Sequence, residues 1–391
     1  MNTSSLMNTY GDRPLTFVRG EGCWLFDSDG KKYLDALGGI AVCGLGHANP
    51  EIAETIATQA KTLLHTSNLY NIPLQQKLAD ELTRISGMDQ VFFANSGAEA
   101  NEAAIKLARL YGHKKGVESP SIVVMEHAFH GRTLATLTAT GNRKVQAGFE
   151  PLVKGFIRAP YNDVQAISRI AENSANVVAI LVEPVQGEGG VHIPSANYLN
   201  ELRAICDTKG WLLMLDEVQT GNGRTGRYFT YQHNDILPDV VTTAKGLGNG
   251  FPIGACLARG KADDVFAPGN HGSTYGGNPL ACSVALKVLE IIERDHLANR
   301  ARILGEIIRQ GFEQQLRDCQ MVGDIRGLGL MIGIELQKPC AALVQQAADK
   351  GLLINVTSGN TIRLLPPLTF SDQQADLLIE TLVPLIQQFQ G

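Results

Sequence analysis

The stretch Trp211-Leu-Leu-Met-Leu-Asp216 is an unbroken apolar run that stops at a carboxylate. Continuous apolar runs of this length are typical of strands that are buried on both faces of a parallel sheet. Similar runs occur at Gln90–Ala94, Ser121–Met125, Val177–Val182 and 240–244. Helical patterns lie between the runs, and this alternation predicts an α/β fold with a mostly parallel central sheet.

The last third of the chain has a different pattern, which predicts a second, smaller α/β domain. Asn278-Pro279 is typical of a helix start, because asparagine caps a helix and proline fits its first position. Shorter elements are expected after that helix, with strands at 328–336, 352–355 and 361–364 and helices near 340–349 and 373–388.

The first residues contain a hairpin-like stretch at 18–27, and we expect it to pack with the smaller domain. The predicted boundaries are 1–48 for the N-terminal segment, 49–300 for the large domain and 301–391 for the small domain.

The composition narrows the classes of protein to consider. The 391 residues are 44% hydrophobic and 19% charged, which excludes a disordered chain. The net charge is −5 and no run of five or six like charges occurs, which argues against nucleic-acid binding. No apolar stretch approaches the ~18 residues of a membrane span, and the N-terminus lacks a secretory pattern. The seven cysteines are scattered without a CxxC pair, so we expect reduced thiols and a cytoplasmic location.

Four polar residues fall at the carboxyl ends of predicted strands, where open α/β sheets bind their ligands: Ser96, Glu183, Asp216 and Lys245. A lysine buried at such a position loses hydration, which lowers its pKa and prepares the neutral amine to attack a carbonyl. Asp216 is suited to hold a protonated ring nitrogen. Ser96-Gly97-Ala98-Glu99 reads as a capping box whose glycine lets an anion such as phosphate approach the helix N-terminus.

Each of these features also has an ordinary structural explanation. Ser96–Glu99 could simply cap a helix, Asp216 could cap a nearby loop, and Lys245 could extend to the surface. Together they match what pyridoxal phosphate requires, namely a phosphate cradle, an acid for the ring nitrogen and a buried lysine.

Three other sequence patterns are weaker indications of function. Gly221-Asn-Gly-Arg-Thr-Gly226 matches G-x-G-x-x-G, but no apolar helix follows it as a dinucleotide site requires. His127 and His130 lack a third ligand at metal-site spacing, so we expect no metal and place His130 in a loop or behind the site. The chain contains no G-x-S-x-G, which argues against a serine hydrolase.

At these residues the chain resembles the class III, fold-type I aminotransferases that use pyridoxal 5'-phosphate, over nearly its whole length. The matching stretches include Asn95-Ser-Gly-Ala-Glu-Ala-Asn-Glu-Ala-Ala104, Phe129-His-Gly-Arg132, Glu183-Pro-Val-Gln-Gly-Glu-Gly-Gly190, Leu215-Asp-Glu-Val-Gln219, Ala244-Lys-Gly246 and Gly272-Ser-Thr-Tyr-Gly-Gly-Asn-Pro279. Within this family, Gly38-Gly-Ile-Ala-Val42 and the compact length favour members of arginine biosynthesis that use N2-acetyl-L-ornithine.

The resemblance implies a role for each cofactor-binding residue. Lys245 binds the cofactor covalently and moves the proton, and Asp216 pairs with the ring nitrogen. Phe129 and Val218 cover the two faces of the ring, and Gln219 contacts its phenolic oxygen. The phosphate is held by Ser96, Gly97, Ala98 and, from the neighbouring subunit, Thr274. The expected partner is therefore a second copy of the chain, in an obligate homodimer.

The resemblance also implies four substrate-binding residues. Arg132 takes the α-carboxylate of acetylornithine, and Ser273 lies nearby. Arg363 holds the α-carboxylate of glutamate, while Glu188 masks it for the ω-amino substrate. A fixed surface ion pair is the alternative for Arg363 and Glu188. Tyr10 matches a substrate-contacting tyrosine of the family more weakly.

One departure bears on substrate choice. Many members carry threonine where this chain has Ala98, and alanine also occurs in succinylornithine enzymes. Succinylornithine is therefore an alternative donor, and ornithine, γ-aminobutyrate and succinyl-diaminopimelate also remain open within the family. A decarboxylase, racemase or aminomutase on the same fold is an alternative reaction, and a nucleotide-binding protein is an alternative of another class.

Overall fold

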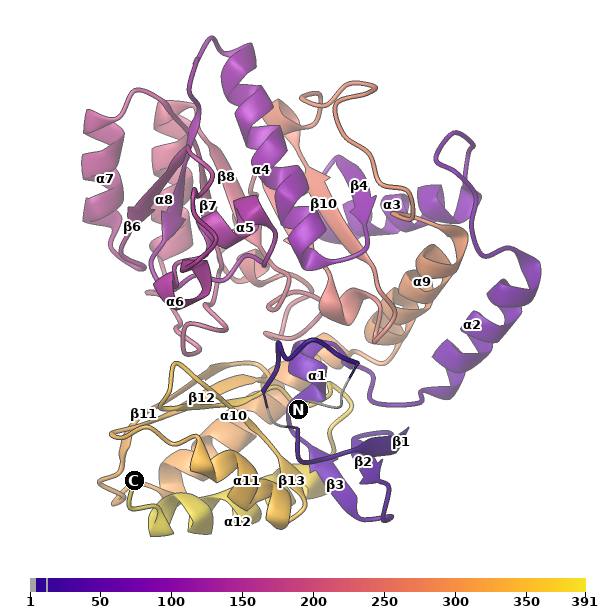
Figure 1. Ribbon diagram of the computed structural model, residues 1–391, viewed down its shortest axis with the longest axis vertical. Helices are drawn as coiled ribbons and strands as arrows, with labels where there is room; N and C mark the ends of the chain where they lie inside the picture. Colours follow the sequence, from indigo (N-terminus) through magenta and orange to yellow (C-terminus); the bar gives the residue numbers. More distant parts are fainter. Residues whose placement is uncertain (1–4, 12) are drawn as a thin grey trace.

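A seven-stranded sheet forms the centre of the larger part of the molecule in the computed structural model, which describes residues 5–11 and 13–391 (Figure 1). Its order is β4-β10-β9-β8-β7-β5-β6, and only β10 runs antiparallel to its neighbours. The strands are β4 (Gln90–Ala94), β5 (Ser121–Met125), β6 (Phe156–Ala159), β7 (Val177–Val182), β8 (Leu212–Asp216), β9 (Val240–Thr243) and β10 (Gly254–Ala258). The predicted mostly parallel sheet is confirmed, with β6 and β10 in addition to the predicted strands.

The continuous apolar runs are explained by helices on both faces of this sheet. In β5, Ile122 and Val124 pack with α4 (Gly97–Lys114), whereas Val123 and Met125 lie in the core shared with α7 (Val164–Asn173) and α8 (Tyr198–Lys209). Because both sets of side chains are fully buried, the strand shows no polar alternation. The other helices of this part are α2 (Pro50–Thr62), α3 (Pro73–Ser86), α5 (Leu134–Ala139), α6 (Arg143–Gln146) and α9 (Pro279–Arg294).

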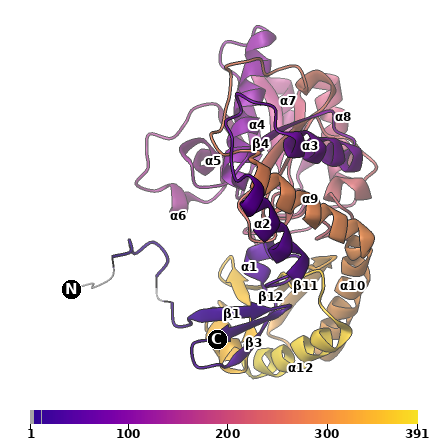
Figure 2. The ribbon, with the colours of Figure 1, turned by 90° about the vertical axis from the view of Figure 1, so that its right-hand side faces the viewer.

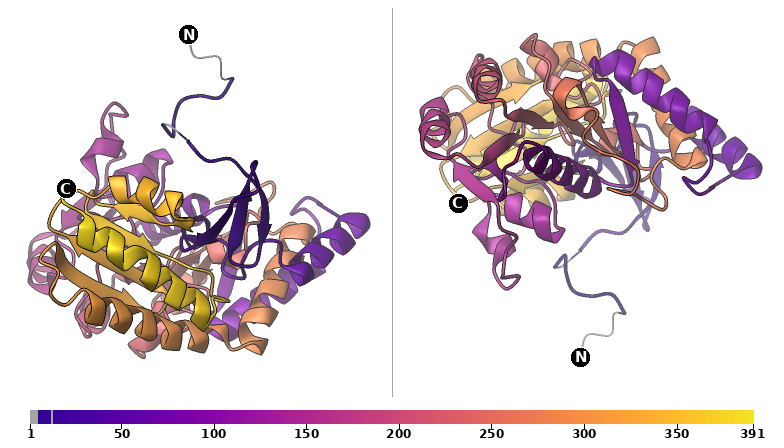
Figure 3. Two further views of the ribbon diagram at one scale, coloured as in Figure 1. Left: turned by 90° about the horizontal axis from the view of Figure 1, so that it is seen from below. Right: turned by 90° about the horizontal axis from the view of Figure 1, so that it is seen from above.

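The smaller part combines both ends of the chain (Figures 1 and 2). Among the described residues, one four-stranded sheet has the order β1-β2-β3-β13 and another has the order β11-β12-β15-β14. Their strands are β1 (Phe17–Glu21), β2 (Trp24–Asp27), β3 (Lys32–Asp35), β11 (Val322–Leu328), β12 (Met331–Leu336), β13 (Leu352–Leu353), β14 (Asn355–Thr357) and β15 (Thr361–Leu364). Figure 3 shows α12 (Asp372–Gln388) along the outside of this part, with α10 (Leu297–Gln315) and α11 (Ala342–Asp349) beside it.

The N-terminal hairpin joins the C-terminal segment through the parallel pairing of β3 with β13. The expected helix start at Asn278-Pro279 is present, since Asn278 Oδ1 accepts a hydrogen bond from the N–H of Ala281. Helix α10 and strand β11 are not among the predicted elements, and α10 runs across the predicted boundary at residue 300. The domain boundaries themselves stay a prediction.

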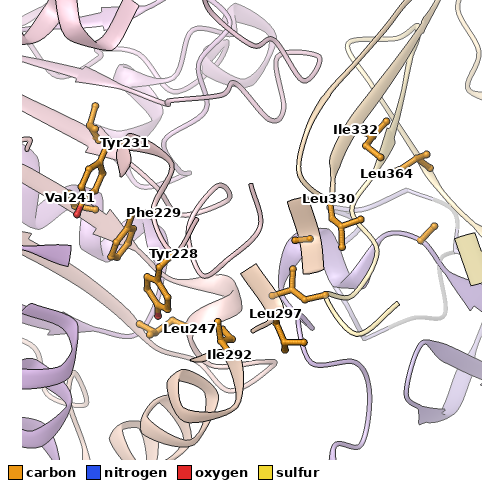
Figure 4. Close-up of a cluster of buried hydrophobic side chains, with 14 of the residues drawn as sticks. Tyr228, Phe229, Tyr231, Val241, Leu247, Ile292, Leu297, Leu330, Ile332 and Leu364 are labelled. Atoms are coloured by element: carbon orange, nitrogen blue, oxygen red, sulfur yellow. The ribbon is translucent and has the colours of Figure 1, made fainter. Parts of the chain in front are cut away.

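A continuous apolar cluster connects the two parts (Figure 4). Tyr228, Phe229 and Leu247 lie on the side of the large sheet, and Leu330 and Ile332 lie on the side of the small one. Between them are Ile292 from the end of α9 and Leu297 from the start of α10. None of the helices in the described ranges is long and apolar enough to span a bilayer.

Candidate active site

The carboxyl ends of β4, β7, β8 and β9 meet at a cavity of about 380 Å³. The sheet brings Ser96, Glu183, Asp216 and Lys245 together there, as the strand-end pattern predicts. Other predicted site residues line the same cavity, and they are Gly97, Ala98, Phe129, Arg132, Val218 and Gln219. A larger cavity of about 570 Å³ lies beside the start of α10 and is lined by none of these residues. We therefore identify the active site by the chemical groups that line it rather than by its volume.

Lys245 follows β9 and begins the short 3₁₀ helix η2 (Lys245–Leu247) with a positive φ of 46°. Loss of hydration lowers the pKa of its amine, and the nearby Arg363 guanidinium acts in the same direction. The carboxylates of Glu188 and Asp216 oppose this shift. A lowered pKa enlarges the fraction of neutral amine, which is the nucleophilic form.

Asp216 is held by side chains of the surrounding elements. Its Oδ2 accepts a hydrogen bond from Asn101 Nδ2 at 2.7 Å and lies 2.7 Å from His130 Nδ1. Its Oδ1 accepts the N–H of Val218 at 3.0 Å, which leaves a second lone pair of that oxygen. These contacts fix the carboxylate of Asp216, while Oδ1 can still accept a further hydrogen bond.

His130 lies in a loop, which is one of the two predicted positions, and it also lines the cavity, whereas Asn101 is a residue that the sequence reasoning missed. Asn101 Oδ1 accepts from Thr242 Oγ1 at 2.7 Å, so β9 fixes the orientation of its amide. A signal was present, because Asn101 lies four residues after Gly97 and so on the same face of one helix. Val42, which reaches the cavity just after α1 (Gly38–Ala41), was also missed.

The N-terminus of α4 differs in detail from the predicted capping box. Ser96 Oγ accepts the N–H of Glu99 at 3.2 Å, but Glu99 Oε2 accepts the N–H of Asn95 at 2.6 Å rather than that of Ser96. A Cβ on Gly97 would lie 2.6 Å from Val218 Cγ1, so the glycine here makes room for Val218. The N–H groups of Gly97 and Ala98 precede that of Ala100, which donates to the carbonyl of Ser96, so they have no acceptor within the helix and suit an anion.

Arg363 and Glu188 lie beside the cavity and form an ion pair. Glu188 Oε1 is 2.6 Å from Arg363 Nη1, which also donates to Gln219 Oε1 at 3.3 Å. Asn355 Oδ1 accepts from Nε and Nη2 of the same guanidinium, at 3.2 and 2.8 Å. The Arg363 side chain is 1% exposed and that of Glu188 is 33% exposed. Burial raises the pKa of Glu188, but the guanidinium outweighs it and holds this pKa below its usual value.

Arg132 lines the cavity near Phe129, with its guanidinium carbon 5.7 Å from the centre of the ring. Ser273 and the exposed Thr274 instead line a neighbouring cavity, to which Asn95 also contributes. Asn95 Nδ2 donates to Ser273 Oγ at 3.3 Å. The single chain therefore does not bring Thr274 to its own Lys245. Tyr10 is 81% exposed and does not line the cavity.

The G-x-G-x-x-G stretch is a buried turn region. Its Arg224 donates to the carbonyl oxygens of Leu330 and Pro366, at 3.0 and 2.5 Å. These contacts join the loop to the smaller part of the molecule, which is a structural role.

The model of the class-III aminotransferase family matches residues 7–386. The chain belongs to the class-III aminotransferases. The resemblance drawn from its motifs is thus confirmed.

Relatives and solved structures of this family cover the chain almost completely. It is 57% identical over 386 residues to an acetylornithine aminotransferase from Nitrosomonas europaea, with 99% of this chain and 98% of the relative covered. An acetylornithine aminotransferase from Methanocaldococcus jannaschii is 46% identical, with coverages of 96% and 94%. The crystal structure of the Toxoplasma gondii ornithine aminotransferase matches with a TM-score of 0.94 at 32% identity, covering 98% of this chain and 92% of that one. The acetylornithine aminotransferase of Elizabethkingia anophelis matches with a TM-score of 0.87 at 34% identity, with coverages of 98% and 96%.

Proposed function

We propose that the protein transfers the δ-amino group of N2-acetyl-L-ornithine to 2-oxoglutarate, which gives N-acetyl-L-glutamate 5-semialdehyde and L-glutamate. The observation that carries this proposal is the placement of Lys245 and Asp216 in one cavity of a class-III aminotransferase. The name of the Nitrosomonas europaea relative, at 57% identity, supports the choice of substrate. The reaction is a step of arginine biosynthesis.

The residues around the cavity fit pyridoxal 5'-phosphate. The N–H groups of Gly97 and Ala98 and the hydroxyl of Ser96 suit its phosphate, and the available lone pair of Asp216 suits its protonated ring nitrogen. Phe129 and Val218 supply apolar contacts for its ring, and Gln219 a polar one for its phenolic oxygen. When bound, this cofactor acts as the electron sink and carries the amino group between the two substrates. A solved ornithine aminotransferase of Toxoplasma gondii is described with PLP at its active site.

Lys245 has two roles in this proposal. Its lowered pKa favours the neutral amine that attaches to the cofactor. During turnover, its Nζ acts as the base of a 1,3-proton shift. It takes the proton from the substrate carbon that carries the amino group and delivers it on the other side of the transferred nitrogen. Asp216, fixed by Asn101 and His130, would pair with the protonated ring nitrogen through which the cofactor draws electrons.

Arg132, Ser273, Glu188 and Arg363 bind the substrates. Arg132 is an exposed cation at the cavity and holds the carboxylate of acetylornithine, and Ser273 contributes from the neighbouring cavity. Arg363 holds the α-carboxylate of glutamate when Glu188 moves away, and Glu188 covers it when acetylornithine presents its distal amine. The burial of Arg363 argues against a fixed surface pair.

The active unit in this proposal is a homodimer, with Thr274 reaching the phosphate of the partner subunit's cofactor. Two features support it. Thr274 is exposed, and large apolar side chains near it are exposed too, namely Leu63, Leu64, Leu69, Tyr70 and Tyr275. Asn68 Nδ2 donates to the carbonyls of Ser273 and Gly276 and so connects the two loops that carry these side chains. Sedimentation equilibrium at micromolar concentration is expected to give twice the chain mass, and a monomer would contradict the dimer.

Amino-donor profiling with 2-oxoglutarate tests the function. N-acetylornithine is expected to give the highest kcat/KM, followed by N-succinylornithine, with ornithine, γ-aminobutyrate and succinyl-diaminopimelate behind. A higher kcat/KM for the succinyl donor would establish the alternative that Ala98 suggests. Release of carbon dioxide or racemised product without glutamate would contradict amino transfer altogether.

A further inference from the structure

Glu183 is a strand-end carboxylate to which the family resemblance assigned no role. It follows β7, its residue is 5% exposed, and it borders the cavity of Lys245. Its Oε1 accepts the N–H of Phe129 at 2.8 Å, and its Oε2 accepts the N–H of Gly187 at 3.2 Å. The two oxygens of one carboxylate therefore hold the main chains of two different loops.

The two loops carry different parts of the proposed chemistry. The ring loop, residues 126–133, carries Phe129, and the gate loop, residues 183–192, carries Glu188. This hydrogen bond holds the Gln186–Gly187 peptide, which immediately precedes Glu188, the residue that carries the masking carboxylate. Two further contacts dock the loops on each other. Gln186 Nε2 donates to the carbonyl of Glu126 at 2.7 Å, and a Cβ on Gly189 would lie 2.7 Å from the carbonyl oxygen of His127.

We propose that Glu183 is a positioning residue that couples Phe129 to Glu188, by holding both loops with one buried carboxylate. Its two side-chain oxygens bind main-chain N–H groups and none of the side chains assigned to the substrates. This inference rests on the proposed function, because it assigns Glu188 the role of the mask on Arg363. The main chain of Glu188 is held by Glu183 at Gly187 and by Thr357 Oγ1, which donates to the carbonyl of Glu188. Both contacts limit how far Glu188 can move, so Glu183 contributes to the balance between the masked and the open Arg363.

The substitution Glu183→Gln separates the two contacts. The carboxamide keeps one acceptor oxygen, which is expected to stay on the shorter contact with Phe129. Its NH₂ group then faces the N–H of Gly187, which loses its acceptor. We expect the Gly187 amide to exchange with deuterium at least about tenfold faster while the Phe129 amide stays protected. Hydrogen exchange read by mass spectrometry with electron-transfer fragmentation measures both, with or without bound cofactor.

The half-reactions supply the second readout. When the N–H of Gly187 has lost its acceptor, Glu188 is held less firmly against Arg363. The ratio of kcat/KM for glutamate to kcat/KM for acetylornithine is therefore expected to rise about tenfold in Glu183→Gln. The matched control is Glu217→Gln. Glu217 is also buried, and its carboxylate accepts the N–H of Tyr231 at 3.1 Å and the hydroxyl of Thr220 at 2.5 Å, residues that belong to neither loop. It is expected to lose stability without a change in the ratio.

An unchanged ratio, or equal changes in both variants, would overturn the proposal. So would a Gly187 or Phe129 amide that exchanges freely in the wild-type protein, a measurement that needs no variant to fold. If the wild-type protein transferred no amino group from either donor, the proposed function would fail instead, and the exchange data would still report on the contacts of Glu183.

Discussion

Replacing Glu188 by alanine removes the carboxylate that lies 2.6 Å from Nη1 of the buried Arg363. Exposed ion pairs are worth about 0–1 kcal/mol, and breaking a buried pair costs about 3–5 kcal/mol. Since Arg363 is inaccessible and Glu188 is one third exposed, the masking contact falls between these limits, at about 1–2 kcal/mol. The kcat/KM of the glutamate half-reaction is therefore expected to rise about 5- to 30-fold in Glu188→Ala.

The acetylornithine half-reaction is expected to respond differently, because its apolar chain meets an unmasked guanidinium. Its kcat/KM should fall or stay unchanged in Glu188→Ala. Arg363→Ala should act in the opposite sense on glutamate, because about 3 kcal/mol of charge-assisted hydrogen bonds to the α-carboxylate are lost, which is about 100-fold.

Single-turnover kinetics of each half-reaction, followed by cofactor absorbance, measures both effects. Glu293→Ala is the control, because it breaks the exposed pair with Arg84 far from the cavity and should change neither half-reaction. If Glu188→Ala and Arg363→Ala each changed the two half-reactions equally, the switch would be refuted.

Three further predictions concern the cofactor site and stability. Asp216→Asn should lower the turnover about 10- to 150-fold, because the ring nitrogen loses a charged acceptor worth about 1.5–3 kcal/mol, and steady-state assays at saturating cofactor check this. Gly97→Ala places a Cβ 2.6 Å from Val218, which should cost about 1–3 kcal/mol in urea unfolding and weaken cofactor binding. The hydrogen bond to Asp35 raises the pKa of His47 from 6.5 to about 9, so its stabilisation is complete below pH 6.5 and lost as the pH rises through about 9. His47→Gln should flatten the unfolding free energy across this pH range, and an unchanged slope would contradict that assignment.

The central sheet and the strand-end residues could be predicted because each buried strand is a short apolar run that a polar residue ends. Strand β10 (Gly254–Ala258) was not predicted because it consists largely of small residues and runs antiparallel. Its sequence therefore resembles neither a run of bulky apolar residues nor an alternating strand. Helix α10 was missed because its apolar residues are interleaved with long polar ones, as in many half-exposed helices.

Within the site, residues that act through tertiary contacts could not be placed from sequence. The need for glycine at 97 comes from Val218, which is distant in the chain and meets it only because β8 lies opposite the start of α4. Asn101 acts through Asp216, and Val42 reaches the cavity from the N-terminal part of the molecule. Such contacts depend on how whole elements pack, and local patterns carry little information about them.

The central claim is that the cavity around Lys245 is the active site of an aminotransferase, and reduction with borohydride tests it most directly. The purified protein is expected to be yellow, and borohydride should fix one pyridoxyl group per chain, on the proteolytic peptide that contains Lys245. Lys245→Ala should keep the cofactor without covalent attachment and lose turnover. A group fixed on another lysine, a colourless protein that binds no pyridoxal phosphate, or wild-type turnover in Lys245→Ala would contradict the account.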